Sequence, residues 1–343
     1  MNILVFTTAF YPSVGGLENQ TFNILDEFIK AGHNIKVITF QAPHAAEHVE
    51  ESKEKRFNIY YNPRYSKVFS LFFWCNVFYM PNFSLKGSWF VLFRPFKKWV
   101  ISHNDLYLSN KKDFKVRLKR LLIKLASKNI AVSNCVATYI DTSAVIIYNC
   151  YDNDIFKIYK DEQRKYEFVF LGRLVSQKGC AMLIEACRNL KTDFTLNIIG
   201  DGPERSIVEK MVREYELEDR VHFLGILEGE ILARTLNNHH CMIIPSLSEE
   251  GFGIVALEGM ACGCNIIAAD AGGLAEAVKS FGKLFKMGSV TELAALLQKQ
   301  IEELDFPLSS CKNEDLKSYL AQQSKKAVAV KYLSVFSDQP SHV

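Results

Sequence analysis

The second half of the chain alternates short apolar runs with amphipathic stretches, and this alternation constrains the fold more than any other feature. Apolar runs bounded by glycine-containing loops predict buried strands, and the stretches between them predict helices. Because a helix separates each strand from the next, we expect a doubly wound parallel sheet. The expected strands are Glu167–Leu171, Phe194–Ile199, Val221–Leu224, Cys241–Ile244, Asn265–Ala269 and Lys283–Phe285. The expected helices are Gly179–Leu190, Glu204–Glu216, Glu228–Asn237, Ile254–Gly263 and Gly273–Lys279.

The first half begins with a similar unit. An apolar run at Asn2–Thr7 leads into a loop that ends in Gly15-Gly16, and an amphipathic stretch follows. In parallel α/β sheets of this kind, ligands bind at the carboxyl ends of the strands. A charged stretch around Asp161 separates the two halves of the chain. We therefore expect two α/β domains, residues 1–160 and 161–321, with the ligand site in the cleft between them.

The glycine pair Gly15-Gly16 lacks the GxGxxG pattern of dinucleotide-binding folds, and no acidic residue ends the next strand to bind a ribose. Paired glycines let backbone N–H groups approach a charged ligand. The alternative is a tight turn without a binding role.

Composition describes a soluble globular chain, since 48% of the 343 residues are apolar and 23% are charged. Nine cysteines without paired CxxC spacing, and no secretory leader, predict a reducing, cytoplasmic environment. Cys262 and Cys264 lack a second pair at zinc spacing, so we expect them to be structural. Asp152 and Asp154 form a DxD pattern, which holds a metal in other transferases, but their place in the interdomain stretch argues against a metal site.

Positive charge gathers in the first half of the chain. Residues 1–155 carry 19 lysines and arginines against 12 aspartates and glutamates, and 13 of the basic residues lie between Lys67 and Lys128. The same region is rich in aromatic residues, and basic plus aromatic side chains favour an anionic surface. The 13-residue run Val68–Met80 is too short to span a bilayer. No nucleic-acid recognition motif is present, so we expect no nucleic-acid partner.

The stretch Phe114–Lys128 predicts an amphipathic helix within this basic region. Such a helix can lie on anionic lipid, in which case the membrane-surface residues are Lys115, Lys119, Arg120 and Lys124. The alternative is a helix packed on the core with a solvated basic face. On either interpretation the apolar side consists of Phe114, Leu118, Leu121, Leu122 and Leu125.

The segment Pro245–Gly273 carries two glutamates eight positions apart. Glu250 precedes Gly251-Phe252-Gly253, and Glu258 lies two turns into the following helix. The glycines allow close approach, and the helix start offers free N–H groups to an anion. A carboxylate placed like Glu258 suits hydroxyl recognition, such as that of a ribose.

Two cations follow the first strand of the second half. Arg173 leaves the strand end, and Lys178-Gly179 opens the next helix. The guanidinium offers a fork of donors and the ammonium a point charge, which together suit a diphosphate. Gly200 and Gly202 end the next strand and are expected to clear space for a ligand.

These motifs resemble glycosyltransferase family 4, whose members are retaining nucleotide-sugar transferases of GT-B fold, with two Rossmann-like domains facing across a cleft. The resemblance departs from the family pattern at Asn265 and Ala275, where proline is usual, and at Cys150, where glycine is usual. It covers most of the chain through Gly15-Gly16-Leu17-Glu18, His103-Asn104-Asp105, Val132-Ser133, Asn149–Phe156, Gly172-Arg173, Lys178-Gly179, Gly200-Asp201-Gly202-Pro203 and Glu250-Gly251-Phe252-Gly253 through Glu258.

The resemblance implies roles for these residues. Arg173 and Lys178 would hold the donor diphosphate, Glu258 the ribose, and Glu250 the transferred sugar, while His103 would face the sugar and the acceptor. The implied catalytic set is His103, Glu250, Arg173 and Lys178. The implied donor-binding set adds Gly15, Gly16, Gly200, Gly202, Phe252, Gly253, Ile254 and Glu258.

The resemblance also implies a mechanism. The acceptor attacks on the face that the nucleoside diphosphate leaves, so configuration is retained without a covalent enzyme nucleophile. Arg173, Lys178 and helix N-termini would stabilise the leaving phosphates, so neither a metal nor a cofactor is expected. The tail Asn313–Phe336 predicts a helix, and in the resembled fold such a helix (about residues 322–338) packs back on the first domain.

The sequence thus predicts a hexosyl-type transferase that moves a sugar from a nucleoside-diphosphate sugar to a glycan or lipid-linked acceptor in cell-surface polysaccharide biosynthesis. Its expected location is the cytoplasm, peripheral to the inner face of an anionic membrane. The alternatives are a sugar-nucleotide epimerase of the same fold and a non-catalytic, membrane-associated partner protein.

Overall fold

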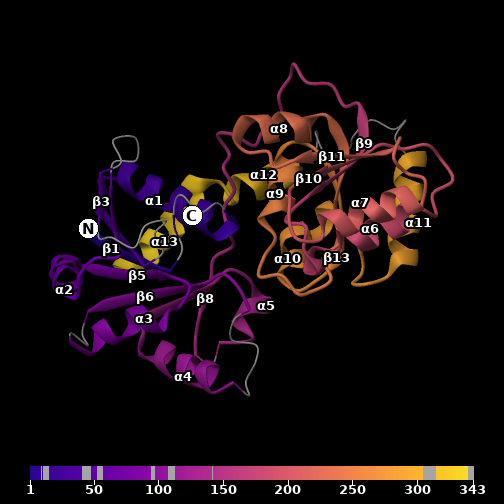
Figure 1. Cartoon of the computed structure of the whole chain (residues 1–343). Coiled ribbons are helices and arrows are strands. Elements are labelled where there is room, and N and C mark those ends of the chain that lie inside the picture. Colours follow the sequence, from indigo (N-terminus) through magenta and orange to yellow (C-terminus); the bar gives the residue numbers. More distant parts are fainter. Residues whose placement is uncertain are drawn as a thin grey trace. The chain divides into compact units, whose positions relative to one another are not determined.

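A computed structural model gives the structure of the chain and describes residues 1–8, 10, 15–40, 48–51, 57–93, 97–106, 113–140, 142–303 and 314–338. The chain divides into two compact units (Figure 1). Unit 1 comprises residues 1–150 and 323–343, and unit 2 comprises residues 151–322. Each unit is a parallel sheet covered by helices, so the predicted class of two doubly wound, Rossmann-like domains is confirmed.

The described part of unit 1 is built on an eight-stranded sheet in the order β3-β4-β2-β1-β5-β6-β7-β8. All neighbouring strands are parallel except β3 and β4, which are antiparallel. The strands are β1 Asn2–Thr7, β2 Asn34–Thr39, β3 His48–Glu51, β4 Asn58–Tyr61, β5 Val77–Pro81, β6 Lys98–His103, β7 Lys128–Ala131 and β8 Val145–Ile146. The helices are α1 Gly16–Lys30, α2 Tyr65–Trp74, α3 Leu85–Ser88, η1 Trp89–Phe93, α4 Phe114–Leu122, η2 Ile123–Leu125, α5 Asn134–Ala137 and α13 Lys325–Ser337.

The helices of unit 1 divide between the two faces of this sheet. Right-handed crossovers that run in opposite directions from β1 place their helices on opposite faces. The connection from β1 to β2 carries α1, whereas the connections β5–β6 and β6–β7 carry α3 with η1 and α4. Figure 1 shows α1 and α13 on one side of the sheet and α2, α3 and α4 on the other.

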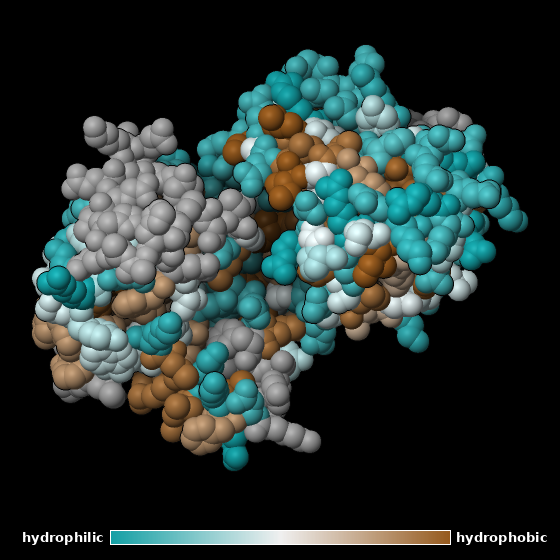
Figure 2. Space-filling model, viewed as in Figure 1, coloured by the Kyte–Doolittle hydropathy of each residue, from teal (hydrophilic) through white to brown (hydrophobic). Residues whose placement is uncertain are grey.

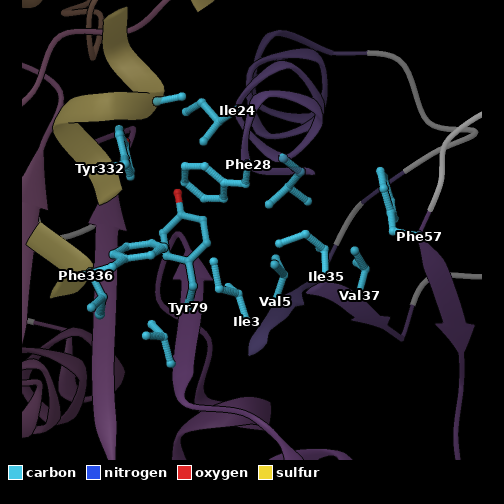
Figure 3. Packing of buried hydrophobic residues seen from close by; sticks show 14 of the residues in the cluster. Ile3, Val5, Ile24, Phe28, Ile35, Val37, Phe57, Tyr79, Tyr332 and Phe336 are labelled. Carbon is cyan, nitrogen blue, oxygen red and sulfur yellow. The ribbon is translucent and has the colours of Figure 1, made fainter. Parts of the chain in front are cut away.

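The core between the sheet, α1 and α13 combines aliphatic side chains with several aromatic rings (Figure 3). The Phe336 ring of α13 lies 5.5 Å from that of Phe28 in α1 and 5.3 Å from that of Tyr79 in β5. Tyr332 is fully buried beside them. These contacts tie α13 to α1 and β5.

The C-terminal tail differs from the single helix expected over Asn313–Phe336. It forms two helices, α12 Glu314–Gln322 in unit 2 and α13 in unit 1. The break comes at Ser324, whose side chain caps α13 by accepting a hydrogen bond from the Ala327 amide at 3.3 Å. Asn313 lies outside the described residues.

Unit 2 contains a six-stranded parallel sheet in the order β11-β10-β9-β12-β13-β14. All six predicted strands are present. The strand order reverses between β9 and β12, because the chain adds β10 and β11 on one side of β9 and β12, β13 and β14 on the other. The strands are β9 Tyr166–Leu171, β10 Leu196–Ile199, β11 Val221–Gly225, β12 His239–Ile244, β13 Asn265–Asp270 and β14 Lys283–Lys286. The helices are η3 Ser176–Lys178, α6 Cys180–Cys187, α7 Arg205–Glu214, α8 Gly229–Asn237, α9 Ile254–Ala261, α10 Gly273–Val278, η4 Lys279–Phe281, α11 Val290–Glu302 and α12.

Helix α4 is shorter than the predicted helix Phe114–Lys128 and faces the sheet with a different side. It ends at Leu122, and Lys128 already belongs to β7. Val116, Arg120 and Ile123, spaced four and three residues apart, are buried against unit 1. The interpretation of Phe114, Leu118, Leu121 and Leu125 as the core-packed side is therefore wrong, since all four are exposed. The grouping of Arg120 with the exposed cations is also wrong, because its side chain is buried.

Candidate functional site

The candidate site lies at the carboxyl edge of the unit 2 sheet, where the loops after β9 and β12 meet. These strands are neighbours at the point where the strand order reverses, and open α/β sheets bind ligands there. The Leu247 amide donates to the Gln177 carbonyl at 2.8 Å. Gly179 has φ of +70°, and a Cβ at this position would overlap the Pro245 carbonyl oxygen. The two loops are thus joined backbone to backbone, which requires glycine at position 179.

An ion pair spans these two loops. Lys178 Nζ lies 2.9 Å from Glu250 Oε1, and the Ser246 hydroxyl donates to the same oxygen. The backbone of Glu250 is fixed as well, because its amide donates to Ala271 and its carbonyl accepts from Gly273 at 2.9 Å. The carboxylate is mostly buried, with 12% of the side chain exposed. The structure therefore brings together two predicted site residues, and it adds Ser246, which the sequence analysis did not single out.

Arg173 lies beside this pair in sequence but differs from it in environment. It follows β9 directly, is exposed, and forms no ion pair with any residue that the structure describes. Leu174, the next residue, is fully buried, and its amide donates to the Asp201 carbonyl at 2.9 Å. The backbone next to Arg173 is therefore anchored at the strand end, while the exposed Arg173 side chain stays accessible to an anion.

Gly200 and Gly202 have a different role from the one expected. A Cβ on Gly200 would overlap the Gly172 carbonyl oxygen, and one on Gly202 would overlap that of Leu174. Gly200 also adopts φ of +131°, a conformation that other residues rarely accept. These glycines let the loop after β10 pack directly on the loop that carries Arg173, so they support the position of that loop.

The segment that leads into α9 supplies the next part of the site. Phe252 is buried and anchors the loop, and Gly253 caps the helix with φ of +97°. A Cβ on Gly253 would come 2.6 Å from Leu274 Cδ1. The Ile254 and Val255 amides begin α9 and, like the first amides of any helix, have no acceptor within it. The Ala256 amide donates to the Gly253 carbonyl at 3.0 Å. The Ile254 and Val255 amides are therefore suited to a negatively charged group.

Glu258 lies in the second turn of α9 and is half-buried. Desolvation, together with the nearby charge of Asp152, raises the pKa of this carboxyl to about 7. A carboxyl that titrates near neutrality can accept hydrogen bonds when ionised and donate one when protonated. Both forms recognise hydroxyl groups.

Asp152 itself belongs to a local turn. Its side chain accepts a hydrogen bond from the Asp154 amide at 3.1 Å, and its carbonyl accepts from Phe156 at 2.8 Å. The DxD pattern is therefore part of a turn at the start of unit 2. In the described residues, no three His, Cys, Asp or Glu side chains gather as a metal site would require.

In unit 1 the structure places His103 away from solvent. Its side chain is fully buried at the end of β6, and Nε2 lies 2.9 Å from Asn129 Oδ1. Burial lowers the pKa of the imidazole to about 4, so the ring is neutral at pH 7. The expected orientation of His103 toward a sugar and an acceptor is not seen in this structure, and a structural role fits its surroundings.

The glycine pair of unit 1 begins a helix. Gly15 is the N-cap residue and Gly16 the first residue of α1. The buried Gln20 side chain of α1 donates a hydrogen bond to Asn149 Oδ1, which joins α1 to the segment that precedes unit 2. Among the described residues, Gln20 Oε1 has no hydrogen-bond partner. The sequence shows the glycines as a motif, whereas Gln20 and Asn149 are 129 positions apart and only the fold brings them together.

Residues 152–317 match the model of one protein family, the glycosyl transferases group 1. An uncharacterized glycosyltransferase of Methanocaldococcus jannaschii is 34% identical over 46% of this chain and 46% of its own length. The 2-deoxystreptamine glucosyltransferase of Streptomyces kanamyceticus is 32% identical over 39% of this chain and 36% of its own length. The chain thus spans less than half the length of these curated relatives.

Solved structures extend the similarity to both units. HepE of Anabaena, solved in complex with UDP, has a TM-score of 0.83 and 20% identity, with 98% of this chain and 100% of HepE covered. The same protein was also solved with UDP-glucose. At this identity the likeness shows the fold, which is GT-B. The family match covers residues 152–317, which is almost all of unit 2.

Proposed function

We propose that this chain, whose second unit matches the model of the glycosyl transferases group 1, is an enzyme that moves a sugar from a nucleoside-diphosphate sugar to an acceptor hydroxyl. The observation that carries the proposal is the Lys178–Glu250 ion pair at the reversal point of the unit 2 sheet, with Arg173 exposed at the end of the adjoining strand β9. Two cations and one carboxylate at that edge match the charges and hydroxyls of such a donor.

The diphosphate would bind the two cations. Arg173 is exposed and not engaged in an ion pair within the described residues, so it can offer its fork of donors without first losing a partner. Lys178 would exchange Glu250 for a phosphate oxygen. The loop contacts made by Gly179, Gly200 and Gly202 hold both cations in place before the donor arrives, which is the preorganisation that electrostatic catalysis needs.

The two glutamates would then bind different parts of the donor. Glu258, on α9, would bind the ribose hydroxyls. Glu250, released from Lys178 by the phosphate, would accept hydrogen bonds from the transferred sugar. The α9 amides at Gly253 and Ile254 would lie against the same sugar or the adjoining phosphate.

The proposed reaction is metal-independent and retains anomeric configuration. The bond from the anomeric carbon to the diphosphate breaks, and the acceptor oxygen bonds to the same face of the sugar. The leaving phosphate takes the acceptor proton, so no side chain is needed as a nucleophile. Arg173 and Lys178 stabilise the charge that develops on the leaving group. The acceptor we propose is a glycan or lipid-linked saccharide of a cell-surface polysaccharide.

The test is calorimetry with UDP-, GDP-, ADP- and TDP-sugars, beginning with UDP-glucose because HepE was solved with it. We expect one nucleotide series to bind and the Arg173→Ala variant to lose most of that binding. If no series binds the wild-type protein, the proposal is overturned. Mass spectrometry of the bound donor after incubation distinguishes transfer to an acceptor from epimerisation, which would leave the donor mass unchanged.

A further inference from the structure

Helix α4 and the turn η2 present an unusual apolar surface to solvent. Phe114 is 77% exposed, Leu121 is 62% exposed and Leu125 is 58% exposed, and Leu118 lies between them. The spacing of four, three and four residues puts these side chains in one stripe. We call Phe114, Leu118, Leu121 and Leu125 the α4 stripe. Figure 2 shows apolar and polar residues side by side over α4 on unit 1.

The α4 stripe is not a core face left open by chance. The helix already buries its other side through Val116, Arg120 and Ile123, so its attachment to unit 1 does not use the stripe. A surface helix normally turns its apolar side inward and its charged side outward. Here a charged residue is buried and four large apolar residues face out. Large exposed apolar patches mark surfaces that bind another body.

Cations flank the stripe. Lys115, Arg117 and Lys124 are exposed, and within the described residues none of them forms an ion pair. The nearest acid in sequence, Asp113, is engaged as the helix cap, since its side chain accepts from the Lys115 amide at 2.7 Å. The surface is therefore apolar and positively charged at once.

Other helices on the same face of the sheet show the same character. Tyr65 and Phe73 of α2 and Phe93 of η1 are all more than half exposed. Tyr65 and Phe93 pack at the edges of the Trp89 ring, with ring centres 5.6 and 5.8 Å apart. Aromatic residues of this kind gather at the boundary between lipid headgroups and acyl chains. The exposed apolar side chains on this face of unit 1 thus extend beyond α4.

We propose that the α4 stripe, with Lys115, Arg117 and Lys124, docks on the surface of an anionic lipid bilayer. The four apolar side chains enter the boundary of the acyl region, and the three cations lie at the phosphate level. Among the helices of the described residues, none has the length and apolar character needed to cross a bilayer. A second copy of the chain is a poorer occupant, because two faces with the same positive charge repel each other.

The proposal is tested by co-sedimentation with vesicles of phosphatidylcholine alone and of phosphatidylcholine with phosphatidylserine. We expect the full chain to pellet with the anionic vesicles only. Replacing Phe114 and Leu121 by glutamate should abolish pelleting. Replacing Lys115, Arg117 and Lys124 by glutamine should weaken it by about fivefold per cation removed.

Matched variants in unit 2 test whether the loss of pelleting depends on the α4 surface or only on the kind of residue that is replaced. Ile231→Glu changes an apolar residue of α8 that is 67% exposed, close to the exposure of Leu121. Glutamine at Lys160, Lys165 and Lys191 removes three exposed charges from unit 2. Both controls should pellet like the wild-type protein. Donor binding is also measured by calorimetry for every variant, to check that the protein is folded and that the candidate site is intact. This check does not depend on lipid binding, because the α4 stripe contains no residue of that site.

Three outcomes would overturn the proposal. The wild-type protein could fail to pellet with either vesicle, which excludes lipid as the occupant. The unit 2 controls could lose pelleting as much as the α4 variants, which excludes this surface. Analytical ultracentrifugation without lipid could instead show a dimer that the Phe114 and Leu121 variants abolish, which would assign the stripe to a second copy of the chain.

Discussion

Lys178 Nζ and Glu250 Oε1 are 2.9 Å apart, so the cation proposed for the diphosphate and the carboxylate proposed for the sugar are partners of each other in this structure. Each residue has the other as a local counter-charge. A donor that takes Lys178 therefore also changes what Glu250 can bind. The pair joins the loops after β9 and β12, so the exchange would take place within one preformed framework.

Glu250→Gln tests this exchange. Without its carboxylate partner, Lys178 is available to phosphate at no cost, so UDP should bind about two- to fivefold more tightly, in keeping with the small free energy of a partly exposed ion pair. Sugar transfer should fall, because Glu250 no longer accepts hydrogen bonds from the sugar. Calorimetry with UDP and a donor-turnover assay measure the two effects. Ser246→Ala is the control, since it removes only a neutral donor to Glu250. Weaker UDP binding by the Gln variant would contradict the exchange.

Arg173→Ala should weaken UDP binding by about 10- to 100-fold, as expected for hydrogen bonds to a charged group. Arg173→Lys should recover part of the loss, because a point charge replaces the bidentate fork. Isothermal titration with UDP and with uridine separates the contributions, since uridine has no phosphate and should bind all three proteins equally. Arg213→Ala, which changes an exposed arginine of α7, should bind UDP like the wild-type protein. A uniform loss of uridine binding would point to misfolding and not to a phosphate contact.

Glu258 predicts a pH dependence. Its folded-state pKa of about 7 lies above the ordinary 4.5, so below pH 7 the carboxyl is protonated and above it ionised. The raised pKa stabilises the fold fully below about pH 4.5, and this contribution is lost as the pH rises through 7. The Glu258→Gln variant cannot titrate at this position. Its free energy of unfolding relative to that of the wild-type protein should therefore increase between pH 5 and pH 8 in paired denaturation curves.

Nucleotide binding should change over the same range. An ionised Glu258 accepts hydrogen bonds from two ribose hydroxyls, so UDP affinity should rise as the pH passes 7. The Gln variant should show a weaker affinity and no rise centred near 7. An identical pH profile for both proteins would assign the titration to another group, such as the UDP phosphate.

The strands of unit 2 could be predicted because each is an apolar run closed by glycine or charged residues. Every predicted strand there lies within two residues of the observed one at its start. The pairing of Lys178 with Glu250 could not be read from the sequence. The two residues are 72 positions apart, and only the strand order β9-β12 makes their loops neighbours. The family resemblance implied a ligand group for each of the two residues, but it did not imply that the two residues contact each other.

The orientation of α4 could not be predicted for a different reason. Helical periodicity shows which residues share a face, but not which face meets the sheet. Hydrophobicity argued for burying Leu121, and the structure buries Arg120 in its place. His103 shows the same limit, because a histidine at a strand end can point to the ligand edge or into the core. Here the imidazole is buried, and its Nε2 lies within hydrogen-bond distance of Asn129 Oδ1 on the neighbouring strand β7.

Gly179 and Gly225 offer a matched test of the loop junction at the candidate site. Their φ angles are +70° and +71°, so alanine costs about the same backbone strain at both, on the order of 1 kcal/mol. At Gly225 a Cβ meets no atom within 4 Å, whereas at Gly179 it overlaps the Pro245 carbonyl oxygen. Gly179→Ala should therefore lower the free energy of unfolding by clearly more than Gly225→Ala in urea denaturation. It should also weaken UDP binding, because separating the loops displaces Lys178, which lies next to Gly179, from its place opposite Glu250. Equal destabilisation by the two variants would show that the loops are not held by this contact.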